Sequence, residues 1–63
     1  MEPEDLRERA RIASETGFLM REWLEANEAV LSYEEFAARA RVCAEYTRHA
    51  KHLEAKVAEL EAE

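Results

Sequence analysis

The second half of the chain carries a helix-start signal followed by a long apolar repeat that no glycine or proline interrupts. Ser32-Tyr33-Glu34-Glu35 matches a capping box, in which serine and glutamate side chains bind each other's backbone amides. Leu31 and Phe36 flank it as a hydrophobic staple. Apolar residues then recur at the two core positions of a heptad, broken only by Arg39: Phe36, Cys43, Ala50 and Val57 at one position, and Tyr46, Leu53 and Leu60 at the other. This pattern predicts one continuous helix over residues 33–62, about 45 Å long.

The first half of the chain has helical periodicity over residues 3–27. Pro3 suits the first turn of a helix, where its missing N–H costs nothing. Small and apolar residues follow at alternating spacings of four and three: Leu6, Ala10, Ala13, Gly17, Met20 and Leu24. A second stripe, about 100° around the helix, holds Ile12, Thr16, Leu19, Trp23 and Ala26. A single partner helix covers less than the combined width of the two stripes. We therefore expect this helix to contact the second helix of its own chain and also another subunit.

The connection over residues 28–32 is short, so the two helices must lie antiparallel and side by side. We therefore predict an all-α fold, an antiparallel helical hairpin with a long second helix, in a single domain over residues 1–63. Gly17 leaves an alternative of three short helices with a break near that residue. The repeat stays in phase through Gly17, which favours a continuous helix. Val30 and Leu31 are expected to fold back over the end of the hairpin.

A chain of 63 residues buries only about 60% of the surface that its unfolded form exposes. Small scaffolds usually add disulfides, a metal or self-association, and the single cysteine, Cys43, excludes an intrachain disulfide. We therefore expect the hairpin to form a homodimer, a four-helix bundle. The expected oligomer interface consists of Ile12, Leu19, Trp23, Tyr46, Leu53, Val57 and Leu60.

Composition excludes several classes of function. The net charge of −6 argues against general binding to nucleic acid or to anionic membranes, which requires a cationic surface. No apolar run approaches the ~20 residues of a membrane span. One cysteine, and an acidic start without a signal-like apolar stretch, predict a cytoplasmic protein. The single glycine excludes a glycine-rich phosphate loop, and we expect no cofactor and no small-molecule substrate.

The residues that could support catalysis or metal binding are few. Cys43 is the one strong nucleophile, but His49 and His52 follow it on the same helix by six and nine residues and cannot reach it. A buried, small apolar role is therefore favoured for Cys43. His49, His52 and Glu45 are the best metal-binding set, yet zinc sites draw three or four ligands from more than one element. We predict no catalytic residue, no metal site and no enzymatic activity.

Phe18 is the strongest candidate for contact with a partner. Helical geometry places it about 100° from the Gly17 stripe, on the side away from Trp23. Arg7, Arg11 and Arg21 lie on the same side. An exposed aromatic residue among arginines can anchor a protein partner, or it can stack on an unpaired RNA base while the arginines bind phosphates. A further contact with another subunit is the third interpretation.

Two resemblances accompany this interpretation. The expected architecture resembles that of the Rop family of small plasmid regulators, in which paired hairpins form a four-helix bundle that binds RNA through its first helices. The turn, with Leu24-Glu25 and Leu31-Ser32-Tyr33-Glu34-Glu35, is similar to that of exonuclease VII small subunits, although the loop here is longer and the start of that family has no counterpart. Neither resemblance extends to individual functional residues.

The sequence thus predicts a non-enzymatic protein–protein interaction module that acts as a homo-oligomer: a small adaptor, inhibitor or accessory subunit of a kind frequent among phage and mobile-element regulators. Its expected partners are a second copy of itself and an unidentified protein. The alternative is a small RNA-binding regulator that uses the basic and aromatic surface around Phe18.

Overall fold

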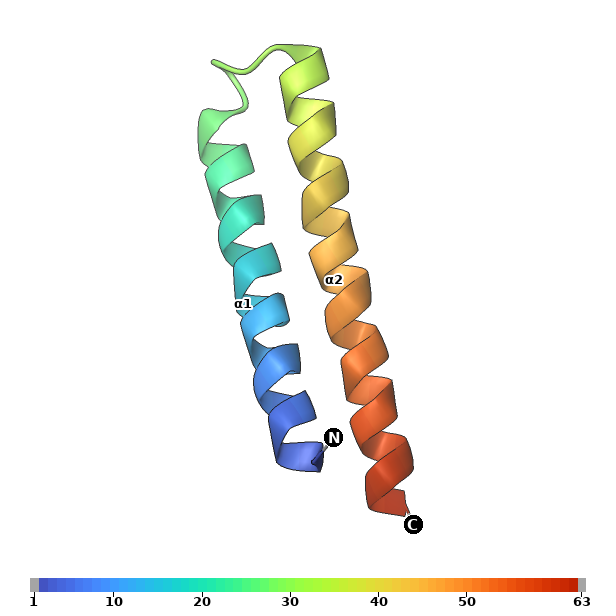
Figure 1. Ribbon diagram of the computed structural model, residues 1–63. Helices are drawn as coiled ribbons and strands as arrows, with labels where there is room; N and C mark the ends of the chain where they lie inside the picture. The colour runs from blue at the N-terminus through green and yellow to red at the C-terminus, as the bar shows by residue number, and fades with distance from the viewer. Residues whose placement is uncertain (1, 63) are drawn as a thin grey trace.

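The computed structural model describes residues 2–62, which form an antiparallel pair of helices joined by a short turn (Figure 1). Helix α1 covers Pro3–Asn27 and helix α2 covers Tyr33–Ala62. The hairpin is a rod of 48 × 14 × 14 Å, and the beginning of α1 lies at the same end as the end of α2. The all-α helical hairpin expected from the sequence is confirmed. Neither helix in residues 2–62 has the length and hydrophobicity needed to cross a membrane.

Helix α1 is bounded by local hydrogen bonds at both ends. The Glu2 carbonyl accepts hydrogen bonds from the amides of Asp5 and Leu6, at 3.1 and 3.2 Å. At the other end, Asn27 Nδ2 donates to the Trp23 carbonyl, one turn back along the helix, at 2.8 Å. The Asn27 carbonyl in turn accepts from the amides of Val30 and Leu31. These bonds end the helix and close the turn.

Helix α2 begins with half of the expected capping box. The Glu35 amide donates to Ser32 Oγ at 3.1 Å, whereas the reciprocal bond from the Ser32 amide to the Glu35 carboxylate is not among the hydrogen bonds of residues 2–62. The expectation that Val30 folds back over the end of the hairpin is wrong, because its side chain is 80% exposed. The turn closed by the Asn27 carbonyl directs Val30 into solvent, while Leu31 is half-buried.

The contact between the helices is narrow and is made largely by small residues. Its buried members are Leu6, Ala10, Ala13, Gly17 and Leu24 of α1, and Cys43, Ala50, Leu53 and Val57 of α2. No side chain among residues 2–62 is completely removed from solvent. The stabilisation from apolar burial is therefore modest for a chain of this length.

Leu53 and Val57 require a correction to the expected interface. The sequence places them in the expected oligomer interface, where a second chain would cover them. Instead they are only 8% and 6% exposed, and they pack in one cluster with Leu6 and Ala10. Helix α1 begins at Pro3 and so reaches the last turns of α2. These two residues therefore belong to the core of the single hairpin.

Gly17 lies in close contact with α2. Helix α1 is continuous through it, so the alternative with three short helices is wrong. A Cβ atom at Gly17 would lie 3.3 Å from Thr47 Oγ1 and 3.6 Å from Tyr46 Cβ. The Cys43 thiol donates a hydrogen bond to the Gly17 carbonyl at 3.2 Å. The absence of a side chain at Gly17, rather than any special backbone conformation, permits this contact.

We predict that the effect of Gly17→Ala on stability depends on Thr47. Alanine gains about 1 kcal/mol of helix propensity, but in the native chain its Cβ crowds the Thr47 hydroxyl, and we expect a change near zero. In a Thr47→Ala background the nearest remaining atom, Tyr46 Cβ, lies at an ordinary contact distance of 3.6 Å. There Gly17→Ala should stabilise by about 0.5–1 kcal/mol. Urea unfolding of the four variants tests this, and equal effects in both backgrounds would contradict it.

Candidate interaction surfaces

One side of the hairpin carries most of its large exposed apolar side chains. We call this set the apolar face; it consists of Ile12, Leu19 and Trp23 of α1 and Val42, Tyr46 and Leu60 of α2. On α1 these residues lie about 120° from the stripe that contacts α2. On α2, Tyr46 follows Arg39 by seven residues and so shares its side of the helix. Because the Arg39 guanidinium lies over the Trp23 ring, the two sets border each other on the same side of the molecule.

The contact between Arg39 and Trp23 explains the one interruption of the heptad repeat. The Arg39 guanidinium carbon lies 4.9 Å from the centroid of the indole ring, a cation–π geometry. Trp23 remains 46% exposed. Sequence reasoning missed this pair, although an arginine at an apolar heptad position, opposite the single tryptophan of the chain, was the available signal.

The expected oligomer interface matches the apolar face in part. Ile12, Leu19, Trp23, Tyr46 and Leu60 are all exposed in the single chain, as a surface for a second copy requires. Leu53 and Val57 are excluded because the core buries them. Val42 is exposed beside Tyr46, Glu45 and His49, and sequence reasoning missed it because it lies one position outside the heptad core. The contact of these residues with another subunit stays a prediction.

A groove lies between the helices on the opposite side. We call it the Phe18 groove; it is lined by Arg21, Leu24, Glu25, Phe36, Ala40, Cys43, Ala44, Thr47 and Arg48. A neighbouring hollow shares Arg21 and Thr47 with it and adds Ser14, Gly17 and Phe18. Phe18 itself is 60% exposed, in agreement with the helical geometry. The lining is mostly apolar, with an arginine from each helix at its border.

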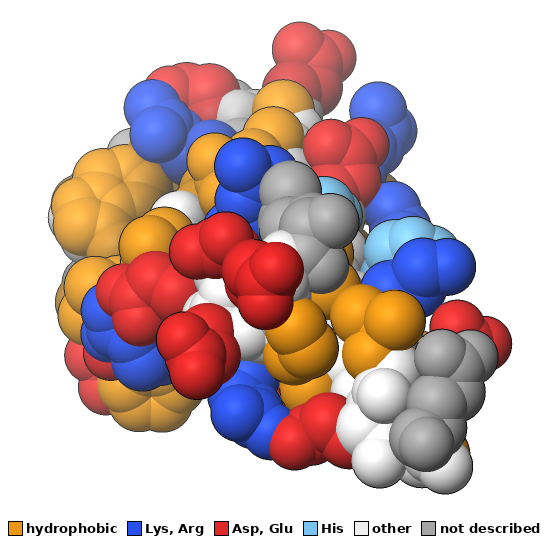
Figure 2. Space-filling model, turned by 60° about the horizontal axis from the view of Figure 1, so that its bottom comes forward, with side chains coloured by type: hydrophobic (Ala, Val, Ile, Leu, Met, Phe, Trp, Pro, Cys, Tyr) orange, Lys and Arg blue, Asp and Glu red, His pale blue; other side chains and the backbone are white. Residues whose placement is uncertain are grey.

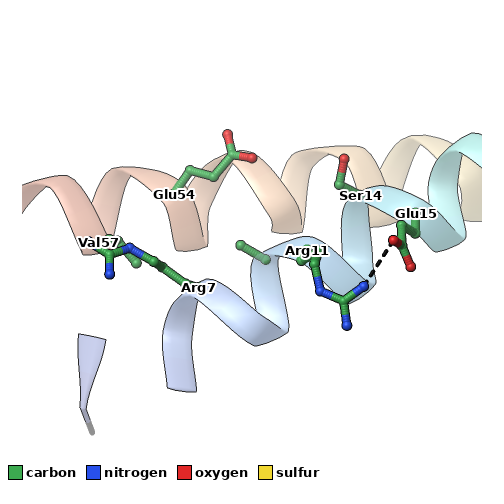
Figure 3. Close-up of a pocket in the computed structure, with 7 residues that line it drawn as sticks. Arg7, Arg11, Ser14, Glu15, Glu54 and Val57 are labelled. Carbon is green, nitrogen blue, oxygen red and sulfur yellow. Dashed lines mark hydrogen bonds and ion pairs between the residues drawn. The ribbon is translucent and has the colours of Figure 1, made fainter. Parts of the chain in front are cut away.

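The three arginines grouped with Phe18 have different surroundings. Arg7 forms an ion pair with Glu61. Arg11 Nη1 lies 2.9 Å from Glu15 Oε1, and Arg11 Nε donates to Glu8 Oε2 at 3.3 Å. Figure 3 shows Arg11 turned toward Glu15, at the side of a hollow that Ser14, Glu54 and Val57 also line. Only Arg21 of the three lines the Phe18 groove.

The carboxylates around Arg11 neutralise it. The hydrogen bond and the positive charge of Arg11 lower the pKa of Glu8 from its ordinary value of 4.5. The same contact, with Glu15 added, raises the pKa of Arg11. Figure 2 shows acidic, basic and apolar side chains interspersed over the visible surface, without a continuous basic patch. Arg7 and Arg11 therefore offer little free positive charge to a phosphate.

The candidates for chemistry lie apart from one another. Cys43 is buried against the Gly17 carbonyl. His49 lies with Val42, Glu45 and Tyr46 along the outside of α2. Within residues 2–62, no group of three or more His, Cys, Asp or Glu side chains is placed to hold a metal ion.

Comparisons with known proteins leave the function open. No family model, curated protein or solved structure matches the chain. Any functional inference therefore depends on the two surfaces themselves.

We predict that the Arg39–Trp23 pair contributes about 0.5–1 kcal/mol to stability, the usual value for exposed cation–π contacts. Arg39→Gln should lower the free energy of unfolding by that amount, whereas Arg41→Gln, which removes a charge from an exposed arginine on the same helix, should have little effect. Combining each variant with Trp23→Leu in urea unfolding isolates the pair. If Arg39→Gln lowered the free energy of unfolding equally with and without the tryptophan, the predicted contribution of the pair would be contradicted.

Proposed function

We propose that this chain is a non-enzymatic protein-interaction module that works as a homodimer, with two hairpins packed apolar face against apolar face in a four-helix bundle. The observation that carries the proposal is the apolar face, where six large apolar side chains stand exposed on one side of a small hairpin. Large apolar side chains gathered and exposed on one side of a small protein often mark a site of association.

The exposed area of the chain favours a second copy as the occupant of this face. The chain exposes 5033 Å², whereas a compact monomer of 7.3 kDa is expected to expose about 4,200 Å². The excess reflects the elongated, 48 × 14 × 14 Å shape of the hairpin, which leaves its apolar face open to a second copy. A twofold dimer uses the same surface on both copies, so one apolar face per chain is sufficient.

The composition of the core gives the dimer an energetic reason. Within each hairpin five of the nine buried positions are alanine, glycine or cysteine, which bury little apolar area. The larger Ile12, Leu19 and Trp23 contribute fully only when a second copy covers them. Fully burying one side chain of this size contributes about 1.5–3 kcal/mol. The dimer interface therefore supplies stability that the hairpin core lacks.

Such a dimer suits an adaptor, inhibitor or accessory subunit, since it displays two copies of the opposite side of the hairpin. A cytoplasmic setting accords with the proposal, because Cys43 is a free buried thiol and structural disulfides are rare in reducing compartments.

RNA binding through Phe18 is the second candidate function, and the exposure of that ring favours it. The surrounding charge does not. Arg7 and Arg11 are already paired with carboxylates, and the net charge is −6. Phosphate contacts supply much of the affinity for nucleic acid, so the protein-interaction proposal has the stronger physical basis.

Sedimentation equilibrium of the purified chain tests the dimer. The native chain should sediment at about twice its 7.3 kDa mass. Leu19→Glu places a carboxylate within the proposed interface and should raise the dimer dissociation constant about 100-fold or more. Val30→Glu makes the same chemical change at the exposed turn and should leave the dimer intact.

Circular dichroism of both variants shows whether helicity is retained. A native chain that remains a monomer at high micromolar concentration would overturn the homodimer, as would equal weakening by Leu19→Glu and Val30→Glu.

A further inference from the structure

We propose that the Phe18 groove binds an amphipathic helix of a partner protein, one that carries carboxylates beside its apolar stripe. This inference rests on the proposed role as a protein-interaction module but not on the dimer, because the groove and the apolar face lie on opposite sides of the hairpin. It specifies the shape and the charge of the second partner.

The dimensions of the groove suit a short helix. Its lining follows α2 from Phe36 to Arg48, a distance of about 18 Å, or roughly three helical turns. The floor combines Leu24 of α1 with Phe36 and Ala40 of α2. Because alanine leaves the space between two helices open, a third helix can place its own large apolar side chains there, as in helix-in-groove recognition.

Phe18 provides an anchor beside this floor. Its ring is 60% exposed and lies in the hollow that continues from the groove through Arg21 and Thr47. Large side chains that become fully desolvated on binding dominate the affinity of most interfaces. An exposed phenylalanine that shares a wall with an apolar groove fits this role.

The charge at the groove selects an acidic partner. Arg21 of α1 and Arg48 of α2 both line it, together with one acidic residue, Glu25. Within residues 2–62 neither of these arginines forms an ion pair, in contrast to Arg7 and Arg11. Since the chain as a whole has a net charge of −6, an acidic partner is repelled elsewhere and attracted here. Local complementarity of this kind sets specificity and orientation.

The proposed dimer would present two such grooves, because its apolar faces are turned inward and the Phe18 grooves outward. A partner with two acidic helices, or a partner that is itself dimeric, would then bind both grooves with increased avidity. A monomeric hairpin would retain one complete groove.

Fluorescence anisotropy with labelled helical peptides tests the inference on the full chain. Three peptides share one leucine stripe over four turns and differ only in the flanking positions, which are all Glu, all Gln or all Lys. The Glu peptide should bind at least about tenfold more tightly than the Lys peptide, and this preference should diminish as salt is raised.

Three variants locate the binding site. Phe18→Ala should weaken binding of the Glu peptide about 30-fold, as for a hot-spot residue. Arg21→Glu should abolish the preference for Glu over Lys, whereas Lys56→Glu, an equal change of net charge at an exposed residue further along α2, should preserve it. Circular dichroism verifies that each variant remains helical.

Several results would overturn the proposal that a partner helix binds the Phe18 groove. These are absence of binding by all three peptides, equal binding of the Glu and Lys peptides, or binding that Phe18→Ala leaves unchanged. Displacement of the Glu peptide by a structured RNA hairpin, with Phe18→Ala weakening the RNA, would assign the surface to RNA instead. Leu19→Glu separates the two proposals: a monomeric variant that still prefers the Glu peptide supports the groove whether or not the native chain dimerises.

Discussion

The close approach of α1 and α2 at Gly17 is the constraint on which the rest of this molecule depends. The absent side chain brings the Gly17 carbonyl within hydrogen-bond distance of the Cys43 thiol, and it leaves the Thr47 hydroxyl only 3.3 Å from where a Cβ would lie. Helices held this closely are joined by a narrow core of small residues. The large apolar side chains of α1 are therefore displaced to the two sides of the contact, where a single hairpin cannot cover them.

The two sides that result differ in chemistry. One gathers aliphatic and aromatic side chains into the apolar face, where the Arg39 guanidinium covers part of the Trp23 ring. The other combines a mostly apolar groove with Arg21, Arg48 and the exposed ring of Phe18. A largely apolar, extended surface suits a symmetric contact with an identical chain. A groove bordered by arginines suits a different and acidic partner, and we propose that the two sides of the hairpin serve self-association and recognition separately.

The hairpin was predictable because its signals are local. Pro3 and Ser32 mark helix starts, and the unbroken repeat after Phe36 has a single helical solution. The phase of the small residues also indicated that α1 continues through Gly17. The directions in which Phe18 and Leu19 point from α1 were predicted correctly, because helix geometry alone determines them.

The errors arose where the answer depends on how one helix is aligned with the other. Leu53 and Val57 were assigned to an interface because the sequence does not reveal how far down α2 the start of α1 reaches; in the fold, Leu6 and Ala10 cover them. The Arg39–Trp23 contact depends on the same alignment. The pairing of Arg7 with Glu61 joins the two ends of the chain, and no local pattern announces it.

The central claim is that one hairpin cannot bury its own large apolar side chains and is stabilised by a second copy. Its most direct test is the thermal unfolding midpoint of the native chain, followed by circular dichroism from about 1 µM to 1 mM. Because association stabilises only the folded state, the account predicts a midpoint that rises steadily with concentration. A midpoint that is the same across this range, in a chain that remains cooperatively folded at 1 µM, would contradict it.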